Sequence, residues 1–187
     1  YDIHTLGFRG EALYSIGAVT KLTVSTRSAA TGEPSTLVID NGMRSEVTDG
    51  GPEKGTTVTA EDLFMDIPAR RSFLKRPSTE ASMCRAMVVS KALAFPSIRF
   101  TFSSDGALRL DWPKAGSLKE RVMMLYRGEG IADADVVELH GDGEGFSIDI
   151  VAGNQAVRRS DRKEIRIYVN GRAVEEYSLQ QAVSYGY

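Results

Sequence analysis

The sequence contains very few of the residues that cross-link a fold. Its single cysteine is Cys84, and its two histidines, His4 and His140, lie far apart along the chain. An intramolecular disulfide and a cysteine-based zinc site are therefore excluded, and we expect no metal site in this chain. The scarcity of cysteine is typical of proteins in a reducing compartment, so we expect a cytosolic protein.

The sequence also lacks long apolar runs and a strong charge of either sign. No run approaches the roughly 20 apolar residues that cross a bilayer, no secretory signal is visible, and we expect no contact with membranes. With 23 basic and 25 acidic residues the net charge is −2, whereas nucleic-acid-binding domains are usually basic. DNA contacts must then come from a local patch, and they should be weak and salt-sensitive.

Apolar residues make up 42% of the chain, which is enough to bury a core without cross-links. In the first part we expect a helix over 11–16 that ends at Gly17. It is followed by segments of alternating apolar and polar residues, as in half-buried strands. These strands cover 22–26, 37–39, 43–48 and 55–61, and Asn41-Gly42 is a strong hairpin signal between the second and the third.

The second part begins near Pro77. Ser78 is expected to cap a helix that runs to Phe95 and stops before Pro96. The buried face of this helix is predicted to consist of Cys84, Val88, Ala92 and Phe95.

A second group of strands is expected after this helix. Their apolar residues alternate over 98–102 and 108–112 with a turn at Asp105-Gly106, over 146–150 after a turn at Asp142-Gly143, and over 165–169 before Asn170-Gly171. A capping box from Ser117 to Glu120 predicts another helix, with Leu118, Val122 and Leu125 on its buried side. The closing segment is expected to be helical.

Strands in groups with few helices between them imply an α+β arrangement, with two units of two layers each. The strands of the first unit have few helices available to cover them. We therefore expect part of its core to come from residues upstream of Tyr1.

The strongest chemical signal is Gly7-Phe8-Arg9-Gly10-Glu11-Ala12-Leu13. Gly7 and Gly10 permit backbone conformations that other residues avoid, and they let a ligand approach the main chain. A helix that starts after Gly10 presents free N–H groups, which favour a phosphate. The segment is neither a Walker A loop nor a dinucleotide fingerprint, so on spacing alone a glycine-rich helix entry without a ligand remains the alternative.

Four segments in order resemble the MutL family of DNA mismatch repair proteins, which belongs with gyrase, Hsp90 and histidine kinases among the GHKL ATPases. Gly7 to Leu13, followed by Ser15-Ile16, resembles the family's nucleotide lid. Gly55-Thr56-Thr57-Val58 is similar to the family motif whose threonine lines the nucleotide pocket. Leu63 to Leu74 is similar to the family's Leu-Phe-x-Asn-x-Pro-Ala-Arg segment. Val169-Asn170-Gly171-Arg172 is similar to a signature of the family's second domain. Asp66 stands where the family usually has Asn, and Tyr14 where a small residue is common.

The resemblance implies both a fold and a site. Residues 1–76 would form the distal, C-terminal part of a Bergerat-type GHKL ATPase sandwich. Residues 77–187 would form a transducer domain like domain 2 of ribosomal protein S5, continuing beyond 187. The implied nucleotide-binding residues are Gly7, Phe8, Arg9, Gly10, Glu11, Ala12, Leu13 and Thr56. ATP and Mg²⁺ are the implied cofactors of the intact protein, and the fragment alone would require none.

No catalytic residue is expected within this chain. In the family, a glutamate upstream of these motifs activates water, an asparagine near it holds Mg²⁺, and a lysine beyond the segment matched here reaches the γ-phosphate. Glu11 is a candidate base, but a glutamate in a first helical turn more often stabilises the helix dipole. The intact protein is expected to hydrolyse ATP, and this fragment alone to be inactive.

Two basic clusters are candidates for contact with DNA phosphates. For Arg158, Arg159, Arg162 and Lys163, expected in a loop, a solvated face paired with Asp161 and Glu164 is an equal alternative. For Arg70, Arg71, Lys75 and Arg76 a solvated face is favoured.

The implied function is ATP-gated signalling in DNA mismatch repair. ATP would close the lid, let two copies dimerise through the ATPase region, and promote DNA binding. The signal would pass from a MutS-type mismatch sensor to a downstream nuclease and helicase, in a bacterial cytosol close to the nucleoid. The alternatives are a non-catalytic module that binds DNA or a partner, and a fragment of another GHKL ATPase such as a topoisomerase subunit.

Overall fold

The computed structural model describes residues 11–52, 54–157 and 164–186. The chain divides into two compact parts, residues 1–76 (unit 1) and residues 77–187 (unit 2). Within the described ranges, no helix has both the length and the apolar character to span a membrane.

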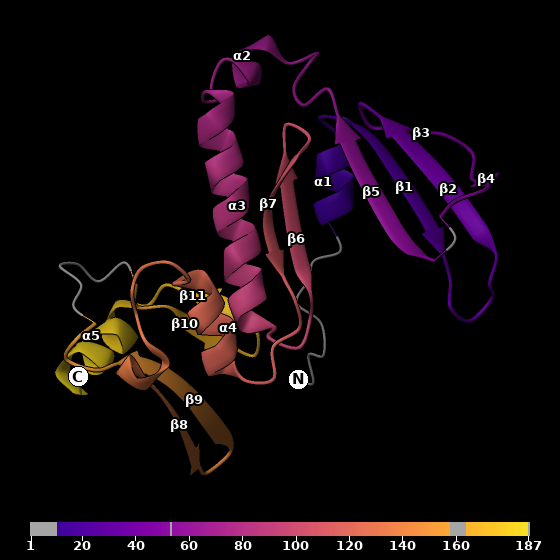
Figure 1. The fold of residues 1–187 in the computed structure, drawn as a ribbon. Coiled ribbons are helices and arrows are strands. Elements are labelled where there is room, and N and C mark those ends of the chain that lie inside the picture. Colours follow the sequence, from indigo (N-terminus) through magenta and orange to yellow (C-terminus); the bar gives the residue numbers. More distant parts are fainter. Residues whose placement is uncertain (1–10, 53, 158–163, 187) are drawn as a thin grey trace. The chain divides into compact units, whose positions relative to one another are not determined.

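Unit 1 is built on one antiparallel sheet (Figure 1). Strand β1 (Lys21–Arg27) lies between β2 (Pro34–Asp40) and β5 (Gly55–Glu61). The other elements are α1 (Ala12–Gly17), β3 (Met43–Arg44), β4 (Thr48–Asp49) and α2 (Pro68–Arg71). The helix expected over 11–16 and the strands expected over 22–26, 37–39 and 55–61 are confirmed.

The register of β1 with both neighbours decides which side chains share a face of this sheet. Leu22 lies opposite Ile39 and Ala60, and Val24 lies opposite Leu37 and Val58. Because side chains alternate along a strand, these six residues form one apolar face. Leu22 is fully buried, whereas Val58 is 50% exposed. One end of the apolar face is therefore covered, while Val24 and Leu37 are half-buried and the β5 edge is exposed.

Helix α1 covers the end of this face that holds Leu22 and Ile39. The contact requires a glycine, because a Cβ on Gly17 would lie 2.9 Å from Cγ2 of Ile39. The carbonyl of Gly17 accepts the N–H of Gly42 at 2.8 Å. Gly42 belongs to the expected Asn41-Gly42 turn, where both residues have positive φ (45° and 85°) as a tight hairpin requires.

The prediction of one continuous return strand over 43–48 is wrong for the middle of that range. It is split into β3 and β4, and its register against β2 shifts by one residue between Ile39–Arg44 and Thr36–Thr48. Ser45 lies at the break, where its Oγ accepts the N–H of Val38 at 3.2 Å. A side-chain oxygen that takes a strand N–H competes with the backbone ladder, and the extra residue bulges outward.

Unit 2 combines helices with three two-stranded antiparallel hairpins. In chain order its elements are α3 (Pro77–Ala94), β6 (Phe100–Ser104), β7 (Ala107–Trp112), α4 (Leu118–Leu125), η1 (Asp133–Asp135), β8 (Val136–Gly143), β9 (Phe146–Gly153), β10 (Ile167–Val169), β11 (Arg172–Val174) and α5 (Tyr177–Gly186). The expected closing helix is confirmed as α5, although β11 comes before it.

Helix α3 starts two residues earlier than expected, so Ser78 lies within its first turn rather than capping it from outside, and the buried face differs in part from the predicted one. Its first residue is Pro77, which suits a first turn because the missing N–H would have no helical partner there. The buried positions are Val89, Ala92 and Leu93, whereas Cys84 is exposed. Of the predicted stripe, Ala92 is buried as expected, Val88 and Phe95 are half-buried, and only Cys84 is exposed, because buried packing is confined to the C-terminal half of the helix.

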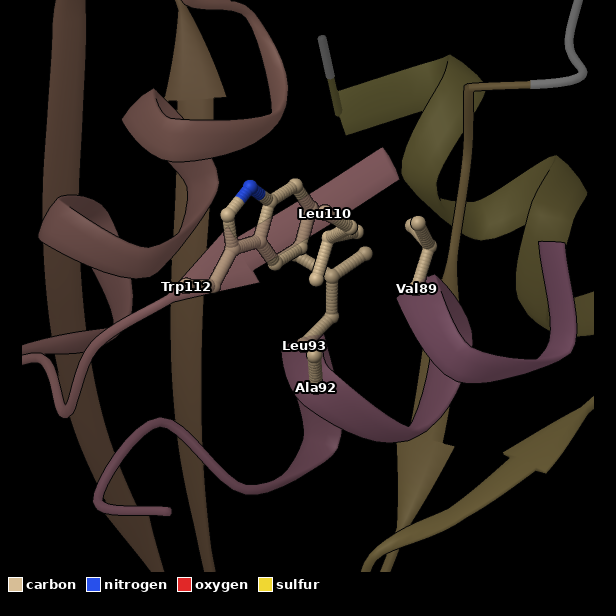
Figure 2. Close-up of a cluster of buried hydrophobic side chains, with 5 residues drawn as sticks. All are labelled: Val89, Ala92, Leu93, Leu110 and Trp112. Carbon is tan, nitrogen blue, oxygen red and sulfur yellow. The ribbon is translucent and has the colours of Figure 1, made fainter. Parts of the chain in front are cut away.

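The core of unit 2 forms where α3 meets β7. Val89, Ala92 and Leu93 pack against Leu110 and Trp112 (Figure 2). Six partly buried side chains surround them: Phe100, Phe102, Val122, Met124, Leu125 and Tyr168.

Leu108 was expected on the same face as Leu110 and Trp112, but it is 61% exposed. The register of the β6–β7 hairpin shifts after Phe102, which lies opposite Leu110, while Ser103 lies opposite Leu108. Arg109 is thus an extra residue on β7, and the bulge turns Leu108 outward.

Two further expectations need correction. Ser117 caps α4 by accepting the N–H of Glu120 at 3.1 Å. The carboxylate of Glu120, however, accepts the N–H of Gly116 at 2.5 Å, so the reciprocal bond of the capping box is displaced by one residue. The turn expected at Asp142-Gly143 falls instead at Glu144-Gly145, because β8 continues to Gly143 and Gly145 supplies the positive φ of 81°.

Arg121 on α4 is fully buried and is held by backbone carbonyls. Its Nη2 donates to the carbonyls of Pro96, Ile98 and Pro113 at 2.7, 2.7 and 2.8 Å. Its Nε has no hydrogen-bond partner among the described atoms. Burial lowers the pKa of Arg121 and the nearby Glu120 opposes that shift, but arginine starts so far above neutrality that it stays charged. One side chain thus joins α4 to the segments on both sides of the β6–β7 hairpin.

Replacing Arg121 by methionine should destabilise unit 2. The change removes the Arg121 donor from the carbonyls of Pro96, Ile98 and Pro113, although Pro96 keeps the N–H of Ala115 at 2.9 Å. Hydrogen bonds from a charged donor contribute about 1.5–3 kcal/mol. Urea unfolding measures the loss. Arg85→Met on the exposed part of α3 is the matched control and should stay within about 0.5 kcal/mol. Equal midpoints for the two variants would contradict a structural role for Arg121.

The stability of the β8–β9 hairpin should depend on pH through the protonation of His140. Its Nδ1 lies 2.7 Å from Oδ1 of Asp149, and its Nε2 lies 3.4 Å from Oδ2 of Asp142. The hydrogen bond to Asp149 raises the pKa of His140, with smaller contributions from the charge of Asp149 and from Asp142. The stabilisation is therefore complete below the unfolded pKa of about 6.5, and it is lost as pH rises through the higher folded pKa.

NMR titration of His140 should give a pKa above the ordinary histidine value, and Asp149→Asn should lower it. Asp105→Asn, in the β6–β7 turn, is the control and should leave the titration unchanged. A wild-type pKa at or below the ordinary value would contradict the assigned ion pair.

Candidate nucleotide-binding site

The predicted lid is described only from Glu11 onward. Gly7, Phe8, Arg9 and Gly10 lie outside the described residues. Glu11 precedes the first helical residue of α1, and its side chain forms no capping hydrogen bond. Glu11, Ala12 and Leu13 are all exposed. The described end of the lid thus presents its side chains to solvent, where a ligand could reach them.

Thr56 lies near the start of β5 with its side chain on the same face as Val24 and Val58. It is exposed. Directly opposite it on β1 is Thr26, and the two Oγ1 atoms lie 2.7 Å apart. Thr26 was not among the predicted site residues. Its position became evident only from the pairing of β1 with β5, because the two residues are 30 positions apart in sequence.

A partly exposed apolar strip separates this hydroxyl pair from α1. Helix α1 covers Leu22 and Ile39 at one end of the sheet face, and the Thr26–Thr56 pair stands at the other end. From Leu22 to Thr26 the strand rises about 13 Å at roughly 3.3 Å per residue. Val24, Leu37 and Val58 line the strip between them. An apolar floor with polar groups at one end is the usual composition of a small-molecule site.

The segment that begins at Leu63 is attached to the loop between α1 and β1 by a backbone hydrogen bond. Phe64 donates its N–H to the carbonyl of Val19 at 2.9 Å. To do so it adopts a φ of 58°, a left-handed conformation that costs a bulky residue about 1–2 kcal/mol. Asp66 accepts a hydrogen bond of 2.5 Å from the Asn41 side chain. An acceptor is all that this contact needs, and the carboxylate of Asp66 supplies it.

The basic cluster Arg70, Arg71, Lys75 and Arg76 lies on α2 and just after it, and all four side chains are exposed. Residues 67–76 contain no Asp or Glu. Phe73, between the two pairs of bases, is 83% exposed. The second predicted cluster, Arg158, Arg159, Arg162 and Lys163, lies outside the described residues.

The described residues contain no group of three His, Cys, Asp or Glu side chains placed to hold a metal ion. A hollow of about 310 Å³ is present in unit 2, where Ser90, Tyr168 and Gln180 contribute to its wall. None of the predicted nucleotide-binding residues lines it.

Similarity to known proteins covers almost the whole chain. The DNA mismatch repair protein MutL of Thermoanaerobacter pseudethanolicus is 34% identical over 98% of this chain. The DNA mismatch repair protein MutL of Acidiphilium cryptum is 38% identical over 99% of this chain. The chain belongs to the MutL family of DNA mismatch repair proteins. It spans about 30% of the length of these MutL relatives.

Comparison with solved MutL structures agrees with this membership. The Aquifex aeolicus MutL ATPase domain in complex with ADP matches with a TM-score of 0.74 and 28% identity. The match covers 94% of this chain and 67% of that domain. A family described as the C-terminal domain of DNA mismatch repair proteins matches residues 127–187, which lie in unit 2. The α+β fold class expected from the sequence is thus confirmed as that of MutL-type GHKL ATPase domains.

Proposed function

We propose that this chain carries part of the nucleotide site of a MutL-type mismatch repair ATPase. The observation that carries the proposal is the Thr56 hydroxyl, which is paired with Thr26 at the start of β5 in the segment that resembles the family's nucleotide-lining motif. The apolar strip beside this pair suits the flat, weakly polar parts of a nucleotide, and a hydroxyl can orient one of its polar atoms. The similar Aquifex aeolicus domain binds ADP, which supports a nucleotide as the ligand.

In this proposal the two units have different roles. Residues 1–76 are the C-terminal part of the GHKL ATPase domain, and residues 77–187 are the S5-like transducer domain. Gly7 to Leu13 form the lid over the nucleotide phosphates, with Gly7 and Gly10 allowing close backbone approach. Glu11 serves the lid rather than acting as the base, and the chemistry of ATP hydrolysis with Mg²⁺ belongs to the intact protein.

The lid connects nucleotide binding to the rest of mismatch repair. ATP favours a closed lid and dimerisation of the ATPase region, and the closed state binds DNA. A MutS-type mismatch sensor and a downstream nuclease and helicase are the proposed partners, in the cytosol. This population shift requires ATP to bind the closed state more tightly than the open one.

A second candidate function is DNA binding that does not depend on nucleotide. The cluster Arg70, Arg71, Lys75 and Arg76 favours it, because four exposed bases lie within seven residues of the chain. Such a cluster suits contact with DNA phosphates, which positions a duplex without reading its sequence. The bases Arg158, Arg159, Arg162 and Lys163, which lie outside the described residues, remain a predicted addition. Nucleotide-independent affinity with a steep salt dependence would favour this function.

Nucleotide binding by the full-length protein is tested with Gly10→Val. A branched side chain at Gly10 should block the approach of the lid backbone to the phosphates. We expect ATP affinity, measured by equilibrium binding, to fall at least about tenfold, which corresponds to about 1.4 kcal/mol.

Gly186→Val is the matched control for this experiment, because a Cβ at Gly186 meets no atom within 4 Å. It should bind ATP as the wild type does. Normal ATP affinity of the Gly10→Val protein would show that the lid assignment is wrong. DNA binding that is unchanged by ATP in the wild type would favour the second candidate function.

A further inference from the structure

Thr26 and Thr56 form a hydroxyl pair on the apolar face of unit 1. They are direct cross-strand partners, and their neighbours on this face include Val24, Val58 and, opposite Thr26 on β2, Ser35. The two Oγ1 atoms lie 2.7 Å apart, and Oγ1 of Thr26 lies 3.4 Å from the carbonyl oxygen of Gly55. The ordinary O–H···O separation is about 2.7–2.8 Å. The bond between the two hydroxyls is therefore the stronger of the two contacts.

Each hydroxyl has one proton to donate. If Thr26 donates to Thr56, the Thr56 proton remains available for a third group. If Thr26 donates to the Gly55 carbonyl, it can accept from Thr56, and Thr56 then offers a lone pair. In both arrangements Thr26 decides whether Thr56 acts as donor or acceptor. Thr26 also restricts the rotation of the Thr56 side chain, because the side chains of Val24 and Val58 offer Thr56 no alternative hydrogen-bond partner.

We propose that Thr26 is a positioning residue for nucleotide binding, which holds the Thr56 hydroxyl in the orientation that meets the nucleotide. This inference rests on the proposed contact between Thr56 and nucleotide. Thr26 acts through Thr56, so its hydroxyl matters for affinity only while the Thr56 hydroxyl is present.

The same sheet provides a matched control on its other face. Ser25 and Thr36 are cross-strand partners with Oγ and Oγ1 2.8 Å apart. Ser25 is adjacent to Thr26, so its side chain points to the opposite face. Thr36 keeps a second bond to the carbonyl of Gly50 at 2.8 Å. Ser25→Ala therefore removes a similar hydroxyl bond from β1, between β1 and β2 and away from the proposed nucleotide.

The experiment measures nucleotide affinity in the full-length protein, with ADP as the probe. Thr26→Val keeps the branched shape and removes the hydroxyl, and we expect ADP affinity to fall about fivefold, the effect of one ordinary hydrogen bond. Thr26→Ser restores the hydroxyl and should stay within about twofold of wild type. Ser25→Ala should bind ADP normally. Urea unfolding should show similar, small losses of stability for Thr26→Val and Ser25→Ala.

Coupling to Thr56 is the decisive measurement. Thr26→Val should cost no additional affinity when it is added to Thr56→Val. Full additivity, or normal ADP affinity of Thr26→Val beside a weakened Thr56→Val, would overturn the role of Thr26 and leave the Thr56 contact standing. Equal ADP losses in Ser25→Ala and Thr26→Val would overturn it as well, because the effect would then be a general one on the sheet. Normal affinity of Thr56→Val would instead refute the nucleotide contact itself.

Discussion

The register of β1 is the constraint on which the candidate site depends. β1 is bonded on both edges, and its pairs with β2 and β5 place Leu22, Val24 and Thr26 on one face. A slip of β1 by one residue would turn Thr26 away from the face that holds Thr56 and would expose Leu22. The slip is resisted because Leu22 is fully buried. The close contact between Gly17 and Ile39 adds a second restraint, because Ile39 must lie opposite Leu22 on the face that α1 covers.

Unit 2 is organised by a different kind of constraint, the burial of a charge. Arg121 is fully buried, and its guanidinium is held by three carbonyls. The rings of Phe100 and Trp112 lie 6.0 and 5.8 Å from the guanidinium carbon, within the range of cation–π attraction. A buried charge is costly unless its donors are satisfied. The segments that supply the carbonyls must therefore keep their positions, which fixes α4 against the β6–β7 hairpin.

Membership of the MutL family and the geometry of unit 1 give different information about Thr56. The family directs attention to nucleotide chemistry at Gly7 to Leu13 and at Thr56. The geometry adds what surrounds Thr56: a partly exposed apolar strip and a hydroxyl partner. The hydrogen bonds of Phe64 and Asp66 do not involve the residues of that strip. Their bonds to Val19 and Asn41 instead hold the end of β5 to the α1–β1 junction and to the hairpin turn.

The sequence by itself determined the local elements and the chemical class of the site. Alternation located β1, β2 and β5, and Asn41-Gly42 located a turn, because these signals act between near neighbours. The motifs indicated a nucleotide for the same reason, since each is contiguous. Tertiary structure alone decided the rest. The pairing of Thr26 with Thr56, the bulges at Ser45 and Arg109, and the burial of Arg121 all depend on contacts between segments distant in sequence. Periodicity carries no information about which strand a residue will face, or by how many residues the register will shift.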